Sequence, residues 1–256
     1  MRESIYLQLI ERKAIQKKSF AVLIDPDHLK INNLETIIKI SNKCKVDYFF
    51  IGGSLILQDR LEETLRLIKE NSLIPTVLFP GNGFQISNNA DALLFLSLVS
   101  GRNPEYLIGK QIEAAPKLRM TSLEIISTAY MLIDGMNSNT ASYISQTQPI
   151  PHNKPEVALA TALAAQYLGF KTIFMDAGSG AKASISTDMV QRVAQMSEVP
   201  LIIGGGITSG QKAKELYQAG ADLIVIGNAI EKDPSLIAEI TSMIENNALS
   251  ENKQLR

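Results

Sequence analysis

Short apolar runs recur along the chain, and stretches with a helical spacing of apolar residues separate them. Runs of this kind, bounded by polar or glycine-containing turns, are typical of strands that are buried on both faces. Parallel strands need crossover connections and are covered by helices, so the alternation predicts a parallel α/β fold. The predicted strands cover residues 20–24, 48–51, 76–79, 92–96, 123–129, 172–175, 201–203 and 223–226.

Eight predicted strands favour a closed (β/α)8 TIM barrel that the whole chain, 1–256, forms as a single domain. An open doubly wound sheet is the alternative, but it would leave the glycine turns near the C-terminus unexplained. Residues 5–16 predict a helix that lies across one end of the fold. The segment 134–154 is too long for an ordinary loop, so we expect a lid, a binding loop or a contact region there.

Two glycine turns directly follow the last two predicted strands. They are Gly204-Gly205-Gly206 and Gly227-Asn228. Glycine lets the backbone approach a ligand closely, and the start of the next helix attracts an anion with its N–H groups. Glycines that only make tight turns are the alternative. Because TIM barrels build phosphate sites after strands seven and eight, the pair predicts a phosphate site on the C-terminal face.

Acidic and hydroxyl side chains follow other strands on the same predicted face. Asp25 follows the first strand, Ser54 the second, and Asp176 ends the sixth. A carboxylate beside an anion site indicates an intervening cation, and Mg²⁺ suits one or two carboxylates plus substrate phosphates. Helix capping is the alternative for Asp25 and Asp27. Asp176 is a candidate general base, with a plain turn aspartate as the alternative.

The composition of the chain argues against several classes of partner and location. A net charge of −1 and a pI near 6.2 give no basic field, so we expect no nucleic acid partner. The single cysteine, Cys44, excludes an intramolecular disulfide and fits a reducing compartment. Residues 1–18 contain no uninterrupted apolar run, which argues against a signal peptide or a membrane anchor. We therefore expect a cytoplasmic protein without stable membrane insertion.

The polar motifs in combination resemble the geranylgeranylglyceryl phosphate synthase family. The resemblance extends over about residues 20–239 and is carried by residues 22–27, 51–54, 100–104 and 174–180 together with the two glycine turns. It implies a Mg²⁺-dependent prenyltransferase of lipid biosynthesis. Such an enzyme joins sn-glycerol 1-phosphate to geranylgeranyl diphosphate, or a similar prenyl diphosphate, through an ether bond and releases diphosphate. It also implies a homo-oligomer.

The resemblance assigns roles to single residues. Asp25 and Ser54 would hold Mg²⁺, and Asp176 would be the catalytic base. Many members carry Tyr-x-Glu where this chain has Phe174-Met175-Asp176, so this chain lacks a phenol and has a shorter acid. The glycerol phosphate would be held by Phe174, Asp176, Ala177, Gly178, Ser179, Gly180, Gly204, Gly205, Gly206, Gly227 and Asn228.

Two other functions share the glycine turns: a phosphosugar isomerase or epimerase, and a non-catalytic barrel that binds a phosphorylated metabolite. Neither needs Ser54 or an apolar groove. A long prenyl tail does need such a groove. Its candidate lining, with core packing as the alternative for each side chain, is Leu78, Phe79, Phe84, Leu94, Phe95 and Leu98.

Overall fold

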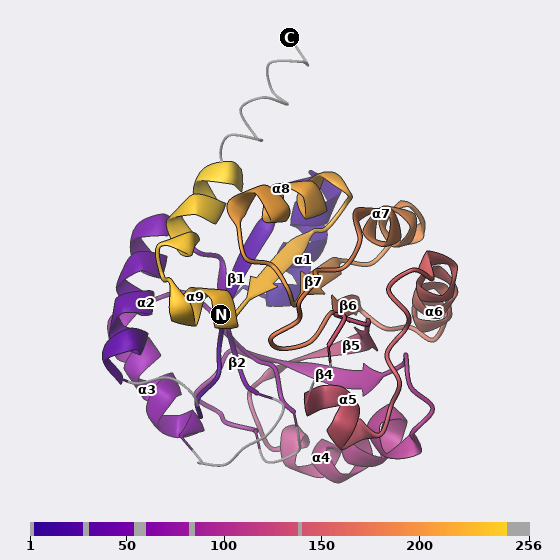
Figure 1. The fold of residues 1–256 in the computed structure, drawn as a ribbon. Coiled ribbons are helices and arrows are strands. Elements are labelled where there is room, and N and C mark those ends of the chain that lie inside the picture. The colour runs from indigo at the N-terminus through magenta and orange to yellow at the C-terminus, as the bar shows by residue number, and fades with distance from the viewer. Residues whose placement is uncertain (1–2, 28–30, 54–59, 82–84, 138–139, 245–256) are drawn as a thin grey trace.

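The described part of the chain forms a closed parallel barrel (Figure 1). The computed structural model describes residues 3–27, 31–53, 60–81, 85–137 and 140–244. Within them, eight strands pair in chain order and β1 pairs with β8, so the predicted TIM barrel is confirmed and the open sheet is wrong. The strands are β1 (Ser19–Ile24), β2 (Tyr48–Ile51), β3 (Thr76–Leu78), β4 (Ala92–Leu98), β5 (Glu124–Leu132), β6 (Thr172–Asp176), β7 (Leu201–Gly204) and β8 (Leu223–Ile226).

Helices surround most of the barrel (Figure 1). A short π-helical turn, η1 (Glu105–Gly109), leads directly into α4. The helix α5 lies within the long segment 134–154, between β5 and α6. The helices are α1 (Ile5–Ala14), α2 (Ile31–Cys44), α3 (Leu61–Asn71), α4 (Lys110–Arg119), α5 (Thr140–Ser145), α6 (Pro155–Tyr167), α7 (Thr187–Met196), α8 (Gly210–Gln218) and α9 (Asn228–Lys232).

Side chains on the strands alternate between two layers of the core. On β1, Phe20, Val22 and Ile24 pack outwards against the helices, whereas Ala21 packs inside the barrel. This alternation follows from the two-residue period of a strand. Both layers are apolar, which is why the strands appear in the sequence as nearly continuous hydrophobic runs.

The helix α1 closes the amino-terminal end of the barrel, as the sequence predicts. Leu9 is buried among the side chains of the barrel interior. Glu124, at the start of β5, accepts hydrogen bonds from Ser4 Oγ at 2.6 Å and from the N–H groups of Ile5 and Tyr6 at 2.7 and 3.0 Å. A carboxylate at the first turn of a helix satisfies donors that have no partner within the helix.

The connection between β3 and β4 departs from the strict strand and helix alternation. Among the described residues 79–81 and 85–91 there is no helix. Pro80 and Gly81, directly after β3, disfavour helix formation. The described part of this connection therefore does not cover the barrel with a helix, unlike the connections that follow β1 and β2. No helix within the described residues is long and apolar enough to cross a membrane.

Replacing Glu124 tests how α1 is held. We expect Glu124→Gln to lower the free energy of unfolding by about 1–2 kcal/mol, because a charged acceptor of three hydrogen bonds becomes neutral. For a chain of this size that corresponds to a decrease of about 2–8 °C in Tm, measured by calorimetry. The matched control is Glu11→Gln on the exposed side of the same helix. Equal Tm values for the two variants would contradict this account.

Candidate active site

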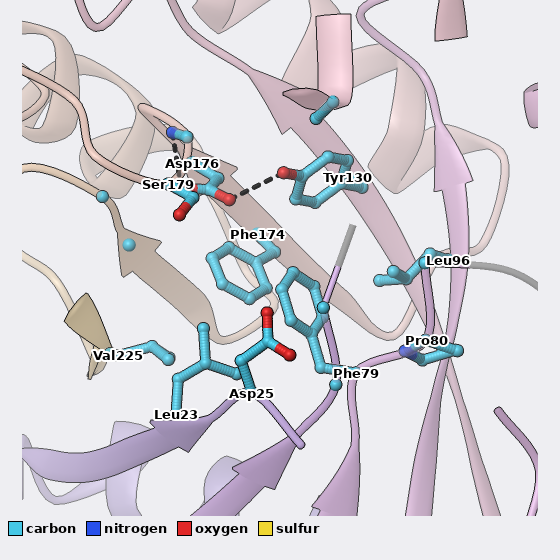
Figure 2. A pocket seen from close by; sticks show the side chains of 18 of the residues that line it. Leu23, Asp25, Phe79, Pro80, Leu96, Tyr130, Phe174, Asp176, Ser179 and Val225 are labelled. Atoms are coloured by element: carbon cyan, nitrogen blue, oxygen red, sulfur yellow. Dashed lines mark hydrogen bonds between the residues drawn. The ribbon is translucent and has the colours of Figure 1, made fainter. Parts of the chain in front are cut away.

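A cavity of about 740 Å³ lies at the carboxyl ends of the strands. Figure 2 shows that side chains from different strands converge on it. Asp25 reaches it from the end of β1 and Asp176 from the end of β6. The predicted residues that line it are Asp25, Phe174, Asp176, Gly178, Ser179, Gly180, Gly204, Gly205, Gly206, Gly227 and Asn228.

One predicted site residue among the described residues is not part of this lining. Ala177 is fully buried in the outer core layer, and its N–H donates a hydrogen bond to the carbonyl oxygen of Gly204 at 3.0 Å. Ala177 therefore holds the end of β6 against β7 and does not face the cavity. Ser54, the second predicted metal ligand, lies outside the described residues.

Asp176 is a buried carboxylate with two hydrogen-bond donors. The Tyr130 hydroxyl donates to Oδ2 at 2.6 Å, as Figure 2 shows, and the N–H of Gly178 donates to Oδ1 at 2.8 Å. Burial raises the pKa of Asp176 above its usual value, and the two hydrogen bonds act in the opposite direction. A carboxylate in this state is a stronger proton acceptor than an exposed one.

Tyr130 was not among the residues predicted to form the site. The predicted fifth strand stops at residue 129, whereas β5 continues to Leu132. Tyr130 pairs in register with Phe174 on β6, so its side chain lies beside the site. Burial and the nearby Asp176 carboxylate raise the Tyr130 pKa well above its usual value, and the phenol therefore remains a hydrogen-bond donor.

The first glycine turn, Gly204-Gly205-Gly206, is packed too closely to accept side chains. Gly205 has φ +80°, and a Cβ atom there would lie 2.7 Å from Asp176 Oδ1 and 2.7 Å from the N–H nitrogen of Gly178. Ser209 then caps α8 by accepting a hydrogen bond from the N–H of Lys212 at 3.2 Å. The backbone itself therefore forms this part of the wall, as an anion site requires.

A side-chain contact joins the two regions predicted to bind phosphate. Ser179, after β6, and Asn228, after β8, hydrogen-bond through their side chains, with an Asn228 Nδ2 to Ser179 Oγ distance of 3.1 Å. Both residues line the cavity. Three loops, after β6, β7 and β8, thus surround one end of the cavity, and the structure brings together the segments that the sequence assigns to phosphate.

Asp25 follows β1 and also lines the cavity, and in Figure 2 the Phe174 ring lies between it and Asp176. Its Oδ1 accepts the N–H of Asp27 at 3.0 Å, so the carboxylate also orders its own turn. Gly53, after β2, leaves room for it, because a Cβ atom at Gly53 would collide with the Asp25 carboxylate. No group of three or more His, Cys, Asp or Glu side chains suited to a metal occurs within the described residues.

The rest of the cavity is a mostly apolar groove, with Lys110, Gln111 and Thr140 among its lining residues. Phe79, Leu94, Phe95 and Leu98 line it, as predicted. Leu78 is wholly buried in the core and does not line it, and Phe84 lies outside the described residues. The groove is built from residues of β4, η1 and α4. Other side chains lining it are Ile86, Leu93, Leu96, Tyr106, Ala114, Leu118 and Ile144.

Three aromatic rings meet between the polar end and the groove. Phe79 and Phe174 stack with centroids 4.9 Å apart and an interplanar angle of 22°. Tyr130 lies edge-on to Phe174, with centroids 5.7 Å apart, and 5.9 Å from Phe79. A Cβ atom at Gly204 would lie 2.9 Å from the Phe174 ring, so glycine leaves the space that this ring occupies.

Comparison with known proteins matches this chain along almost its whole length. The profile of the PcrB family covers residues 12–245. Geranylgeranylglyceryl phosphate synthase of Chitinophaga pinensis is 51% identical over 247 residues, which are 95% of this chain and 97% of the relative. The enzyme of the same name from Pyrococcus horikoshii is 40% identical over 228 residues, 89% of each chain.

A solved structure agrees with the fold. It is the crystal structure of (S)-3-O-geranylgeranylglyceryl phosphate synthase from Thermoplasma acidophilum in complex with its substrate sn-glycerol-1-phosphate. The TM-score is 0.89 at 31% sequence identity, and the match covers 95% of this chain and 98% of that one.

Substituting Gly205 tests the glycine wall. We expect Gly205→Ala to raise the KM for glycerol phosphate at least tenfold, because the added methyl group must displace Asp176 or the Gly178 backbone. The matched control is Gly169→Ala, because Gly169 has a similar φ of +85° and no atom near the added methyl group. Both variants carry the left-handed backbone strain of about 1–2 kcal/mol. An unchanged KM in a folded Gly205 variant would contradict the assignment.

Proposed function

The chain belongs to the PcrB family, and from this premise we propose how its cavity joins sn-glycerol 1-phosphate to a prenyl diphosphate with the help of Mg²⁺. The predicted resemblance to geranylgeranylglyceryl phosphate synthases is confirmed. The protein is a prenyltransferase that acts on glycerol phosphate in ether lipid synthesis. The observation that carries the proposal is one cavity with a buried carboxylate, a glycine wall and an apolar groove.

The glycine turns after β6, β7 and β8 hold the phosphate of the acceptor. With its phosphate held there, the acceptor places a glycerol hydroxyl at Asp176, the carboxylate at the same end of the cavity. As the hydroxyl oxygen attacks C1 of the prenyl group, its proton passes to Asp176. The C1–O bond to diphosphate breaks, and its electron pair leaves with the diphosphate. The products are an ether and free diphosphate, so atoms and charges balance.

Asp25 receives the diphosphate end of the second substrate. A lone carboxylate would repel a diphosphate, so this arrangement supports a bound cation, and Mg²⁺ prefers such a ligand together with substrate phosphates. Ser54 is the second proposed ligand and is assigned from the sequence motif alone. Bound Mg²⁺ supplies positive charge beside the departing diphosphate. Gly53 contributes by leaving space around the Asp25 carboxylate.

The apolar groove receives the prenyl tail, and geranylgeranyl diphosphate is the proposed donor. Burial of the tail in the groove removes apolar surface from water and contributes about 0.8 kcal/mol per buried CH₂ group. A phosphosugar isomerase or epimerase, the alternative with the same glycine turns, has no use for such a groove. Neither does a barrel that only binds a phosphorylated metabolite.

The proposal is tested by incubating the protein with sn-glycerol 1-phosphate, radiolabelled geranylgeranyl diphosphate and Mg²⁺, and then extracting into organic solvent. We expect labelled lipid phosphate, and no product after Mg²⁺ is removed with EDTA. Asp25→Asn should abolish most turnover while calorimetry shows nearly unchanged binding of glycerol phosphate. The control is the neighbouring Asp27→Asn, since Asp27 does not line the cavity. Full activity of Asp25→Asn would contradict the metal assignment.

Asp176 is tested by changing its charge and its length separately. Asp176→Asn keeps the shape and removes the base, so we expect kcat to fall by about 10²- to 10⁴-fold with little change in KM. Asp176→Glu should retain substantial activity, because family members carry the longer acid at this position. A Glu variant as inactive as the folded Asn variant would indicate a geometric role instead of proton transfer.

Tyr130→Phe tests the environment of the same carboxylate. The Tyr130 hydrogen bond lowers the Asp176 pKa, so its removal raises that pKa further. The base must be ionised, and activity is lost as the pH falls through its pKa. We therefore expect the acidic limb of the kcat/KM profile to move to higher pH in Tyr130→Phe. The matched control is Tyr106→Phe in the groove, which should leave the limb in place. If the acidic limb of the kcat/KM profile lay at the same pH in both variants, Tyr130 would have no influence on the pKa of Asp176.

A further inference from the structure

The reacting carbon of a prenyl diphosphate has a defined place in this cavity. Its diphosphate belongs to the polar side, where Asp25 lies, and its tail belongs to the groove along β4. The carbon that joins the two therefore lies at their boundary. The half-buried Phe79 occupies this boundary and lines the cavity between Asp25 and Leu96, as Figure 2 shows.

The ring of Phe79 does not stand alone. Phe174 stacks on it and is itself 1% exposed, so one face of Phe79 is covered by a fixed ring. Tyr130 lies edge-on to Phe174, and its hydroxyl is held by Asp176. We call Phe79, Phe174 and Tyr130 the ring cluster. Phe79 directly follows β3, Tyr130 lies in β5 and Phe174 lies in β6, so the barrel fixes their relative positions.

We propose that the ring cluster, through the face of Phe79, stabilises the positive charge that develops on the allylic carbons during prenyl transfer. The inference rests on the proposed function. As the C1–O bond breaks and its electron pair leaves on diphosphate, positive charge spreads over C1 and C3. The glycerol oxygen then forms the new bond to C1, and its proton goes to Asp176. Phe79 forms no bond in this sequence.

Physical reasons favour a ring at this point over an aliphatic side chain. The face of an aromatic ring carries negative charge density and attracts a cation, most strongly where water is excluded. A carboxylate at the same point could capture the cation by forming an ester, which a ring does not do. Leu23, Val225 and Leu96 line the same cavity, so aliphatic side chains are compatible with its surface. An aliphatic side chain in place of Phe79 would lack the attraction.

Fluorination of the Phe79 ring tests the proposal, because it reduces the charge density of the ring face with little change in volume. We expect site-specific incorporation of mono-, di- and trifluorophenylalanine at residue 79 to lower kcat stepwise, by about 2- to 30-fold at the last step. The same series at Phe49, which is buried in the outer core layer and does not line the cavity, is the matched control and should leave kcat unchanged. A flat series at residue 79 would overturn the proposal.

A binding measurement separates charge stabilisation from packing. Two unreactive analogues of geranylgeranyl diphosphate are compared, one with a protonated amine in place of C3 and one with a saturated bond between C2 and C3. We expect Phe79→Leu to weaken inhibition by the amine by about 2- to 30-fold and to leave inhibition by the saturated analogue unchanged. Equal weakening of both inhibitors would mean that Phe79 only packs against the substrate.

The proposed function and the role of the ring cluster are overturned by different results. A wild-type protein that forms no ether lipid from glycerol phosphate and geranylgeranyl diphosphate would overturn the proposed function. An active wild-type protein with a flat fluorination series and no discrimination between the analogues would overturn the role of the ring cluster alone.

Discussion

Pairing between β1 and β8 closes the barrel, and the position of every functional group depends on that closure. The register joins Ser19 to Leu223 and Val22 to Ile226. Because all eight strands are parallel, their carboxyl ends share one rim. Asp25 from the first strand and Asn228 after the last are brought to the same cavity although most of the sequence separates them. An open sheet of the same strands would leave these residues at opposite edges.

The position at the carboxyl ends of the strands also determines the electrostatic environment of the site carboxylates. The interior below it is filled by apolar side chains, so a carboxylate placed on it is partly removed from water. Asp176 shows both sides of this arrangement: burial makes its charged form less favourable, whereas Tyr130 and the Gly178 N–H stabilise that form. The Asp176 carboxylate can therefore ionise although it is largely removed from water. This combination follows from the position of the residue and not from its chemical type.

The fold and most of the site could be predicted from the sequence because their signals are local. Eight apolar runs and two glycine turns are visible without knowledge of any distant contact. Tyr130 could not be found in this way, because its role depends on a distant contact. Its strand pairs with β6, and its hydroxyl donates to Asp176, which lies 46 positions further along the chain. The end of β5 was wrong by three residues, and this error hid the site residue that it contains.

Two further departures also have non-local causes. Ala177 belongs to a motif whose neighbours line the cavity, yet the β-strand alternation turns its side chain into the outer core. The general alternation of strands and helices predicts a helix after each strand, but none occurs among the described residues 79–81 and 85–91. Pro80 and Gly81 are local signals against it, but the groove along β4 becomes apparent only when the barrel is assembled.

The two halves of the cavity are built on different strands. The glycine turns that follow β7 and β8 line one part, whereas residues of β4 line the groove. β3 and β4 share only the register pairs Val77 with Ala92 and Leu78 with Leu93, so their junction in the barrel wall is short. A longer or shorter tail changes how far the groove is filled and leaves the alignment of the reacting ends unchanged. Chain-length preference and catalytic geometry are thus separable properties of this barrel, and one can change in evolution while the other is conserved.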